Sequence, residues 1–205
     1  IALPDPVGEV IAGRTLPNGL SVRNVRVPMG VVGMIYEARP NVTVDAACLA
    51  LKSGNAVLLR GGTAAENTNV VLVRLMKEAV ESVGIPADAV ASVDEWGREG
   101  ATELMKARGY IDLLIPRGGT GLIQSVVENS VVPVIETGVG NCHVFINADA
   151  DKERAVAIAL NAKTHRPGVC NAAETLLLHS GFKYGGDVLK ALAEAGVTLH
   201  VDTAA

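Results

Sequence analysis

The chain has 205 residues and a formal net charge of −4, with 49% hydrophobic but only 3% aromatic residues. This length predicts one large or two small domains with an aliphatic core, and the lack of a Lys/Arg cluster argues against a nucleic-acid partner. No apolar run approaches the roughly 18 residues of a membrane span and no secretory signal opens the chain, so we expect a cytoplasmic protein without a membrane partner.

The first two thirds of the chain alternate between strand and helix patterns. Residues 1–27 are rich in Pro and Gly, which indicates a connecting arm of turns and short strands. Five apolar runs then predict strands at 31–36, 56–59, 90–93, 111–115 and 131–135. Helical spacing between them predicts helices over about 42–52, 64–83, 98–108 and up to Asn129. This alternation is typical of a Rossmann-like open parallel sheet covered on both faces.

The last third predicts the start of a second α/β unit. Its elements are a strand at 144–147, a helix at 152–163, a strand at 175–179, a helix at 184–195 and a strand at 197–201. We therefore expect a connecting arm at 1–27, a cofactor-binding domain at 28–135 and part of a catalytic domain at 136–205.

Three glycine-rich turns follow predicted strands, where ligands of open α/β sheets bind. They are Arg60-Gly61-Gly62, Arg117-Gly118-Gly119-Thr120-Gly121 and Gly138-Val139-Gly140. Such turns can simply connect strand to helix, but two Arg-Gly-Gly turns favour phosphate binding. The Gly-x-Gly-x-x-Gly fingerprint is absent, because the third glycine is missing after Gly119.

Two polar residues near these turns have alternative interpretations. Arg60 is either a surface cation paired with a carboxylate or a ligand for the 2′-phosphate of NADP. Asn41 follows Pro40 before a helix and is either its N-cap, which the residues alone favour, or an amide donor to an oxyanion.

Three cysteines, an odd and sparse number, fit a reducing compartment. Cys170 lies in a Pro- and Gly-containing loop between a helix and a strand, so we predict that it is a catalytic nucleophile. Cys142, in another predicted loop, is the rival, and Cys48 is predicted to be core filler. Glu136 ends the fifth predicted strand and is a candidate general base or a solvated carboxylate. No Cys/His spacing indicates a metal site.

Several long motifs resemble the aldehyde dehydrogenase superfamily, and within it the gamma-glutamyl phosphate reductase family. The superfamily motifs are Val27-Pro28-Met29-Gly30-Val31-Val32-Gly33, Leu51-Lys52-Ser53-Gly54-Asn55 with the strand to Arg60, and Glu136-Thr137-Gly138. The more specific ones are Glu37-Ala38-Arg39-Pro40-Asn41, Leu59-Arg60-Gly61-Gly62, Ile115-Pro116-Arg117-Gly118-Gly119 and Thr164-His165-Arg166-Pro167-Gly168-Val169-Cys170-Asn171.

This resemblance implies NADPH-dependent reduction of L-glutamate 5-phosphate to L-glutamate 5-semialdehyde and phosphate, in proline biosynthesis. It assigns Cys170 as the nucleophile that forms a thioester, and Asn41 as an oxyanion donor, above its role as a cap. Glu136 matches the superfamily base, although reduction of an acyl phosphate consumes no water. Arg60 stands where many relatives have Lys, consistent with a contact to the cofactor phosphate.

The family also implies a homo-oligomer in the full-length protein and a functional link to glutamate 5-kinase. Its chains extend on both sides of these 205 residues, so we expect this chain to be part of a longer one, with poor activity alone. The alternatives are a CoA-acylating or simple aldehyde dehydrogenase, and a non-catalytic nucleotide-binding fragment or partner-binding scaffold.

Overall fold

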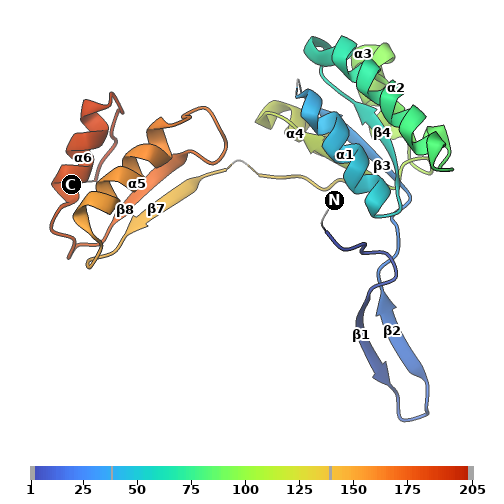
Figure 1. Ribbon diagram of the computed structural model, residues 1–205, viewed down its shortest axis with the longest axis horizontal. Coiled ribbons are helices and arrows are strands. Elements are labelled where there is room, and N and C mark those ends of the chain that lie inside the picture. The colour runs from blue at the N-terminus through green and yellow to red at the C-terminus, as the bar shows by residue number, and fades with distance from the viewer. Residues whose placement is uncertain (1–2, 38, 139, 203–205) are drawn as a thin grey trace. The chain divides into compact units, whose positions relative to one another are not determined.

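A computed structural model describes residues 3–37, 39–138 and 140–202 (Figure 1). Its contacts divide the chain into two units, Ile1–Thr137 and Gly138–Ala205. Within the described residues, no helix combines the length and apolar character that crossing a bilayer requires.

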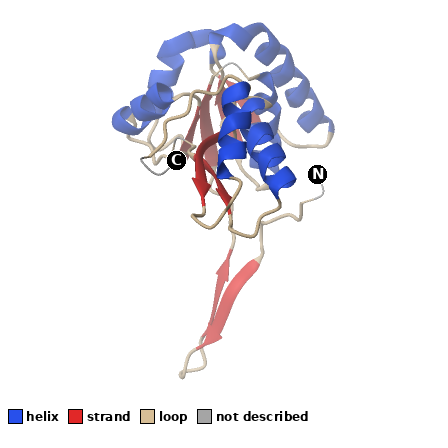
Figure 2. Cartoon of the chain, turned by 90° about the vertical axis from the view of Figure 1, so that its left-hand side faces the viewer, coloured by secondary structure: helices blue, strands red, loops and turns tan. Residues whose placement is uncertain are grey.

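The first unit opens with an antiparallel hairpin. Strand β1 (Val10–Thr15) pairs with β2 (Ser21–Val25), and every residue of both strands is exposed. Gly19 has a φ of 86° in the connecting turn, a conformation that glycine adopts without strain. In Figure 2 the hairpin stands apart from the other strands as a two-stranded ribbon.

The core of the first unit is a parallel sheet in the order β5-β4-β3-β6. Its strands are β3 (Val31–Tyr36), β4 (Ala56–Arg60), β5 (Val90–Ser92) and β6 (Leu113–Arg117). Strand β3 pairs with β4 on one side and β6 on the other, in parallel register throughout. All four strands therefore end at the same edge of the sheet.

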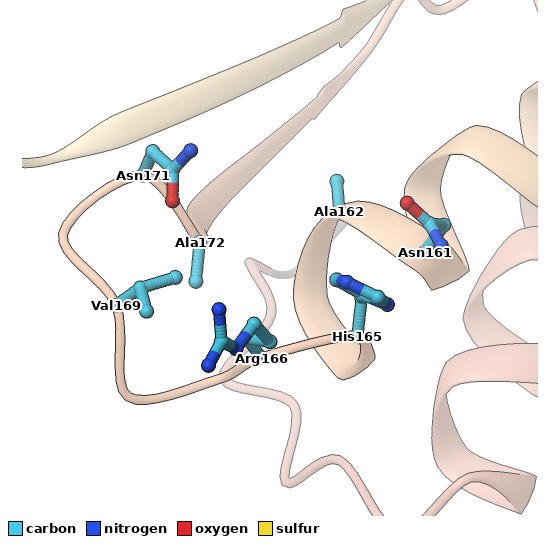
Figure 3. Close-up of a pocket in the computed structure, with 7 residues that line it drawn as sticks. All are labelled: Asn161, Ala162, His165, Arg166, Val169, Asn171 and Ala172. Carbon is cyan, nitrogen blue, oxygen red and sulfur yellow. The ribbon is translucent and has the colours of Figure 1, made fainter.

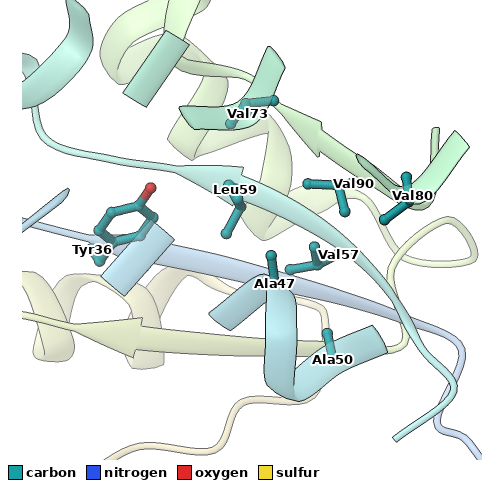
Figure 4. Close-up of a cluster of buried hydrophobic side chains, with 8 residues drawn as sticks. All are labelled: Tyr36, Ala47, Ala50, Val57, Leu59, Val73, Val80 and Val90. Carbon is teal, nitrogen blue, oxygen red and sulfur yellow. The ribbon is translucent and has the colours of Figure 1, made fainter. Parts of the chain in front are cut away.

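Helices cover both faces of this sheet, as a fully buried parallel sheet requires. They are α1 (Pro40–Lys52), α2 (Glu66–Ser82), α3 (Gly97–Lys106) and α4 (Thr120–Asn129), with short 3₁₀ turns at Thr63–Ala65, Ala87–Ala89 and Asp94–Trp96. One apolar cluster joins α1 and α2 to the sheet through residues such as Ala47, Leu59 and Val73 (Figure 4). Another joins α3 and α4 through Leu104, Leu114 and Val126. This confirms the predicted Rossmann-like class.

The fifth predicted strand, 131–135, is wrong as a full strand. Only an isolated parallel bridge joins Val134 to Leu114 of β6, with hydrogen bonds from Leu114 N–H to Pro133 O and from Ile135 N–H to Leu114 O. Pro133 has no N–H to donate, so the ladder cannot continue through it.

The second unit is a smaller α/β layer. Strand β7 (Cys142–Ile146) pairs in parallel with β8 (Ala173–Leu178). Helices α5 (Lys152–Thr164) and α6 (Gly185–Glu194) pack on this pair through a cluster of Ile146, Ala155, Ala159, Phe182, Val188 and Leu192. Asp151 caps α5 by accepting a hydrogen bond of 2.9 Å from the Arg154 N–H.

The predicted strand at 197–201 is also wrong, since the structure shows no strand over these residues. Val197 N–H instead bonds back to the Leu192 carbonyl at the end of α6, and Val197 and Leu199 pack against the apolar cluster of this unit. Apolar alternation becomes a strand only where a neighbouring strand accepts its backbone hydrogen bonds.

A buried hydrogen-bond chain lies beneath the carboxyl edge of the first sheet. The Tyr36 hydroxyl is 2.6 Å from Thr43 Oγ1, which donates to Asn69 Oδ1 at 3.0 Å. Thr43 and Asn69 are fully buried and Tyr36 is 1% exposed. Burial raises the pKa of Tyr36 to about 12, with a smaller contribution from the negative charge of Asp94 and an opposing one from the Thr43 hydrogen bond.

We expect Tyr36→Phe to unfold about 1 kcal/mol more easily at neutral pH, because a buried hydrogen bond is lost. The pKa of Tyr36 is higher in the folded state, about 12, than in the unfolded state, about 10. The protonated phenol therefore makes its whole contribution to stability below pH 10, and this contribution is lost as the pH rises through about 12. The wild type should therefore lose up to roughly 2–3 kcal/mol more than Tyr36→Phe across that interval. Urea unfolding at several pH values measures this, and parallel profiles would contradict it.

Candidate functional site

Three sequence motifs meet at the carboxyl edge of the parallel sheet. Because β3 lies between β4 and β6, the segment after β3 lies between the turn at Arg60-Gly61-Gly62 and the turn at Arg117-Gly118-Gly119. The chain runs from β3 outward through β4 and β5 and then returns to β6 on the other side of β3. In open α/β sheets this reversal creates the crevice where ligands bind.

The turn after β4 is held by a buried carboxylate. Gly61 N–H donates to Asp94 Oδ1 at 2.6 Å, and the Arg60 Nε donates to the Gly97 carbonyl at 3.0 Å. Asp94 lies two residues after the end of β5 and is 7% exposed. The segment from Asp94 to Gly97, between β5 and α3, therefore fixes both the backbone of the turn and the direction of the Arg60 side chain.

Gly61 has no room for a side chain. A Cβ at this position would overlap the Asn69 amide nitrogen and lie 3.2 Å from the Tyr36 ring. Around it, two buried polar atoms, Asn69 Nδ2 and Asp94 Oδ2, have no hydrogen-bond partner among the described residues. The turn after β4 thus packs closely on the buried polar side chains of Asn69 and Asp94.

The turn after β6 is held in a similar way by Glu37. Its Oε2 accepts a hydrogen bond of 3.0 Å from the Gly119 N–H at the start of α4. A Cβ on Gly118 would lie 2.7 Å from the Glu37 carboxyl carbon and 2.8 Å from the Leu122 side chain. A carboxylate is favourable here because the first N–H groups of a helix attract negative charge.

These contacts refine the sequence prediction. The Gly61 and Gly119 N–H groups, which the glycine turns offered to a phosphate, both donate to carboxylates of the protein itself. Sequence reasoning did not single out Glu37 or Asp94 for this role. The available signal was their position, since each follows the last residue of its parallel strand directly or closely.

Asn41 is not the N-cap that the sequence pattern favoured. Helix α1 begins at Pro40 with Arg39 in the capping position, so Asn41 is the second helical residue. Proline fits this position because the first helical N–H has no partner in the helix. Asn41 is exposed, and its Nδ2 reaches Asp45 Oδ2 at a long 3.4 Å. Its amide is thus held at the start of α1, near the end of β3.

Cys48 is exposed, contrary to the prediction of core filler. The buried positions of α1 are Thr43, Ala47 and Ala50, and Cys48 lies beside the exposed Leu49 on the other side of the helix. A shift of one residue turns a helical side chain by about 100°, which separates Cys48 from Ala47.

In the second unit, Cys170 is exposed in the loop between α5 and β8. Two consecutive turns shape this loop, with Val169 N–H donating to Arg166 O at 3.2 Å and Ala172 N–H to Val169 O at 3.1 Å. Cys170 is the second residue of the latter turn. The loop therefore holds its thiol at the surface between two regular elements.

The segment before β7 supports this loop from the other side. Cys142 is the first residue of β7 rather than part of a loop, and its thiol donates to the Cys170 carbonyl at 3.3 Å. Gly140 is equally close, since a Cβ there would lie 2.8 Å from the same carbonyl oxygen. Val139, in the third predicted glycine turn, lies outside the described residues.

A cavity of about 400 Å³ opens beside the Cys170 loop (Figure 3). The last turn of α5 contributes Asn161 and His165, and the loop contributes Arg166 and Asn171, with walls from Val169 and two alanines. Arg166 and His165 were near Cys170 in sequence alone. In the folded loop, His165 and Arg166 line the same cavity as Val169 and Asn171, the residues before and after Cys170.

The other predicted site residues belong to different segments of the chain. Glu136 is exposed in the chain that leads out of the first unit, and Arg117 ends β6, partly buried. Asn41, Arg60 and Arg117 belong to the first unit, and Cys170 belongs to the second. No group of three or more His, Cys, Asp or Glu residues in the described part of the chain is arranged to hold a metal ion.

The chain thus combines a doubly wound α/β unit with a second α/β unit that exposes Cys170 in a loop. The sequence model of the Aldehyde dehydrogenase family matches residues 6–204, and the chain belongs to this family.

Similar proteins share a more specific name. The chain is 65% identical over 203 residues to a gamma-glutamyl phosphate reductase of Kineococcus radiotolerans, covering 98% of this chain and 47% of that protein. It is 56% identical over 201 residues to one of Geobacillus kaustophilus, covering 98% and 49%. The chain therefore spans about half the length of the curated relatives that it matches.

Solved structures agree with these relatives. The gamma-glutamyl phosphate reductase of Thermotoga maritima superposes with a TM-score of 0.86 at 48% identity, over 96% of this chain and 48% of that one. An acetylating aldehyde dehydrogenase of Geobacillus thermoglucosidasius gives a TM-score of 0.67 at 25% identity, over 84% and 38%. The fold is thus that of the aldehyde dehydrogenases.

We expect Gly61→Ala to destabilise the protein by about 1–3 kcal/mol, because the new methyl group overlaps the Asn69 amide. Gly121→Ala is the matched control, since it lies in α4 with open space around its Cβ and should be neutral or up to about 1 kcal/mol stabilising. Denaturant midpoints compare the two variants. Equal midpoints would contradict this prediction, because they would mean that the Asn69 side chain moves aside without loss of stability.

Proposed function

We propose that the protein containing this chain reduces L-glutamate 5-phosphate to L-glutamate 5-semialdehyde and phosphate, using NADPH, as an oxidoreductase of proline biosynthesis. The observation that carries the proposal is the exposed Cys170, in a loop motif shared in sequence with the gamma-glutamyl phosphate reductase family, in a chain 65% identical to a relative of that name. The long match over 98% of the chain favours this substrate over a CoA thioester or a simple aldehyde.

Cys170 acts as the nucleophile in this proposal. Its sulfur bonds to C5 of the acyl phosphate, the C5–O bond breaks, and the electron pair leaves with the phosphate, which takes up the thiol proton. When bound, NADPH supplies the hydride that reduces the resulting thioester. The thiohemiacetal then collapses to the aldehyde and returns the thiol. Asn41 serves as a donor to the oxyanion formed at C5.

Two arginines at the carboxyl edge of the first unit support the proposed binding of NADPH. Arg60 at the end of β4 and Arg117 at the end of β6 are cations flanking the reversal in strand order. Gly62 and Gly118 permit backbone to approach a phosphate closely. Arg60 is steadied by the Gly97 carbonyl, which leaves its other N–H groups available for a 2′-phosphate.

Glu136 is kept as a proposed base. Reduction of the acyl phosphate needs no activated water, so the role of Glu136 would be limited to moving the thiol proton. The homo-oligomer and the functional link to glutamate 5-kinase also remain proposals for the full-length protein.

We expect Cys170→Ala to lower turnover at least about a thousandfold, because the covalent route is lost. The assay is phosphate-dependent reduction of NADP⁺ with glutamate semialdehyde, run on the full-length protein. Cys48→Ala is the control, since it removes another exposed thiol and should retain activity. Retained turnover in Cys170→Ala would refute the mechanism, as would iodoacetamide labelling of Cys170 no faster than Cys48.

We expect Arg60→Ala to weaken NADPH binding roughly ten- to a hundredfold while leaving NADH binding nearly unchanged, because only NADPH carries the 2′-phosphate. Arg74→Ala removes the same charge from an exposed position of α2 and should affect neither cofactor. Fluorescence titration of the reduced cofactors gives both affinities. An equal loss of affinity for NADPH and NADH would contradict this prediction, because Arg60 would then contact a part common to both cofactors or serve only to stabilise the fold.

A further inference from the structure

The cavity beside Cys170 is lined by polar side chains without partners. Asn161, His165, Arg166 and Asn171 all face it, and none of these four side chains forms a hydrogen bond or ion pair within the described residues. None of its seven lining residues carries a carboxylate. The hollow is therefore rich in unused donors and has no negative charge of its own.

Two lysines of the same unit are paired with carboxylates. Lys163 pairs with Glu174 at 3.7 Å, and Lys152 pairs with Asp187 at 3.1 Å. Arg166 is the cation left without a counterion in the lining of the cavity. Its guanidinium presents a planar set of donors that suits phosphate and carboxylate groups.

The position of the cavity determines which anion it would take. Its walls include Val169 and Asn171, the two residues that flank Cys170. Figure 3 shows Arg166 directed into the hollow between Val169 and Ala172. A group bound here lies against the two residues that flank the thiol in the chain. In an acyl phosphate the group on the carbon that the thiol attacks is the phosphoryl group, whereas the α-carboxylate of glutamate lies at the far end of the substrate.

We propose that this cavity is the subsite for the leaving phosphoryl group, with Arg166 as its anchor and His165 and Asn171 as further donors. The assignment rests on the proposed function for its substrate. Arg166 neutralises the charge that the phosphate gains when it takes the C5–O electron pair, and it holds inorganic phosphate for attack on the thioester in the reverse direction.

The first test measures binding without turnover. Inorganic phosphate, at constant ionic strength set with NaCl, should slow iodoacetate labelling of Cys170 in a saturable manner. Arg166→Gln should weaken this protection about ten- to a hundredfold. The matched control is Arg154→Gln, which removes the same charge from the first turn of α5, roughly 15 Å along the helix from His165. It should leave protection unchanged.

Absence of phosphate protection in the wild type, or equal protection in Arg166→Gln, would overturn the subsite. This readout does not require catalysis, so it remains valid if Cys170→Ala proves that the proposed reaction is wrong.

The second test separates the two anionic ends of the substrate. In the phosphate-dependent oxidation of glutamate semialdehyde, Arg166→Gln should raise the KM for phosphate about ten- to a hundredfold and leave the KM for the semialdehyde nearly constant. Arg166→Lys keeps the charge but lacks the planar guanidinium, so its KM for phosphate should fall between those of the wild type and Arg166→Gln. A raised KM for the semialdehyde alone would assign the cavity to the α-carboxylate and refute the proposal.

Discussion

Parallel pairing of β3 with both β4 and β6 is the constraint on which the first unit depends. It brings three segments that are far apart in sequence to one edge: the chain after Tyr36, the turn at Arg60 and the turn at Arg117. Because the strands enter that edge in the same direction, their unpaired backbone groups gather there. The helices on both faces then bury the two faces of the sheet.

Two carboxylates manage the backbone groups that gather at the edge. Asp94 holds the Gly61 N–H, and Glu37 holds the Gly119 N–H. Each comes from the strand beside the one whose turn it secures, so the contacts tie neighbouring strands together. The shape of both turns is consequently set by contacts within the protein itself.

In the second unit a small number of contacts shape the Cys170 loop. Gly140 and Cys142 both approach the Cys170 carbonyl, and a turn joins Arg166 to Val169, which line the cavity. The loop thus presents a thiol and a cation-lined cavity together. This pairing is the basis of the proposed reaction, in which a charged group leaves from the carbon that the thiol attacks.

The sequence by itself determined the class of fold, the exposed loop of Cys170 and the two Arg-Gly-Gly turns, because periodicity, glycine placement and long local motifs are properties of neighbouring residues. Only the tertiary structure decided what lies opposite them. In the folded chain Cys48 is exposed, the predicted fifth strand is reduced to one bridge beside Pro133, and residues 197–201 have no partner strand. The N–H groups of Gly61 and Gly119 donate to Asp94 and Glu37. The contacts of Gly61 and Gly119 depend on partners distant in the chain, which local pattern does not specify.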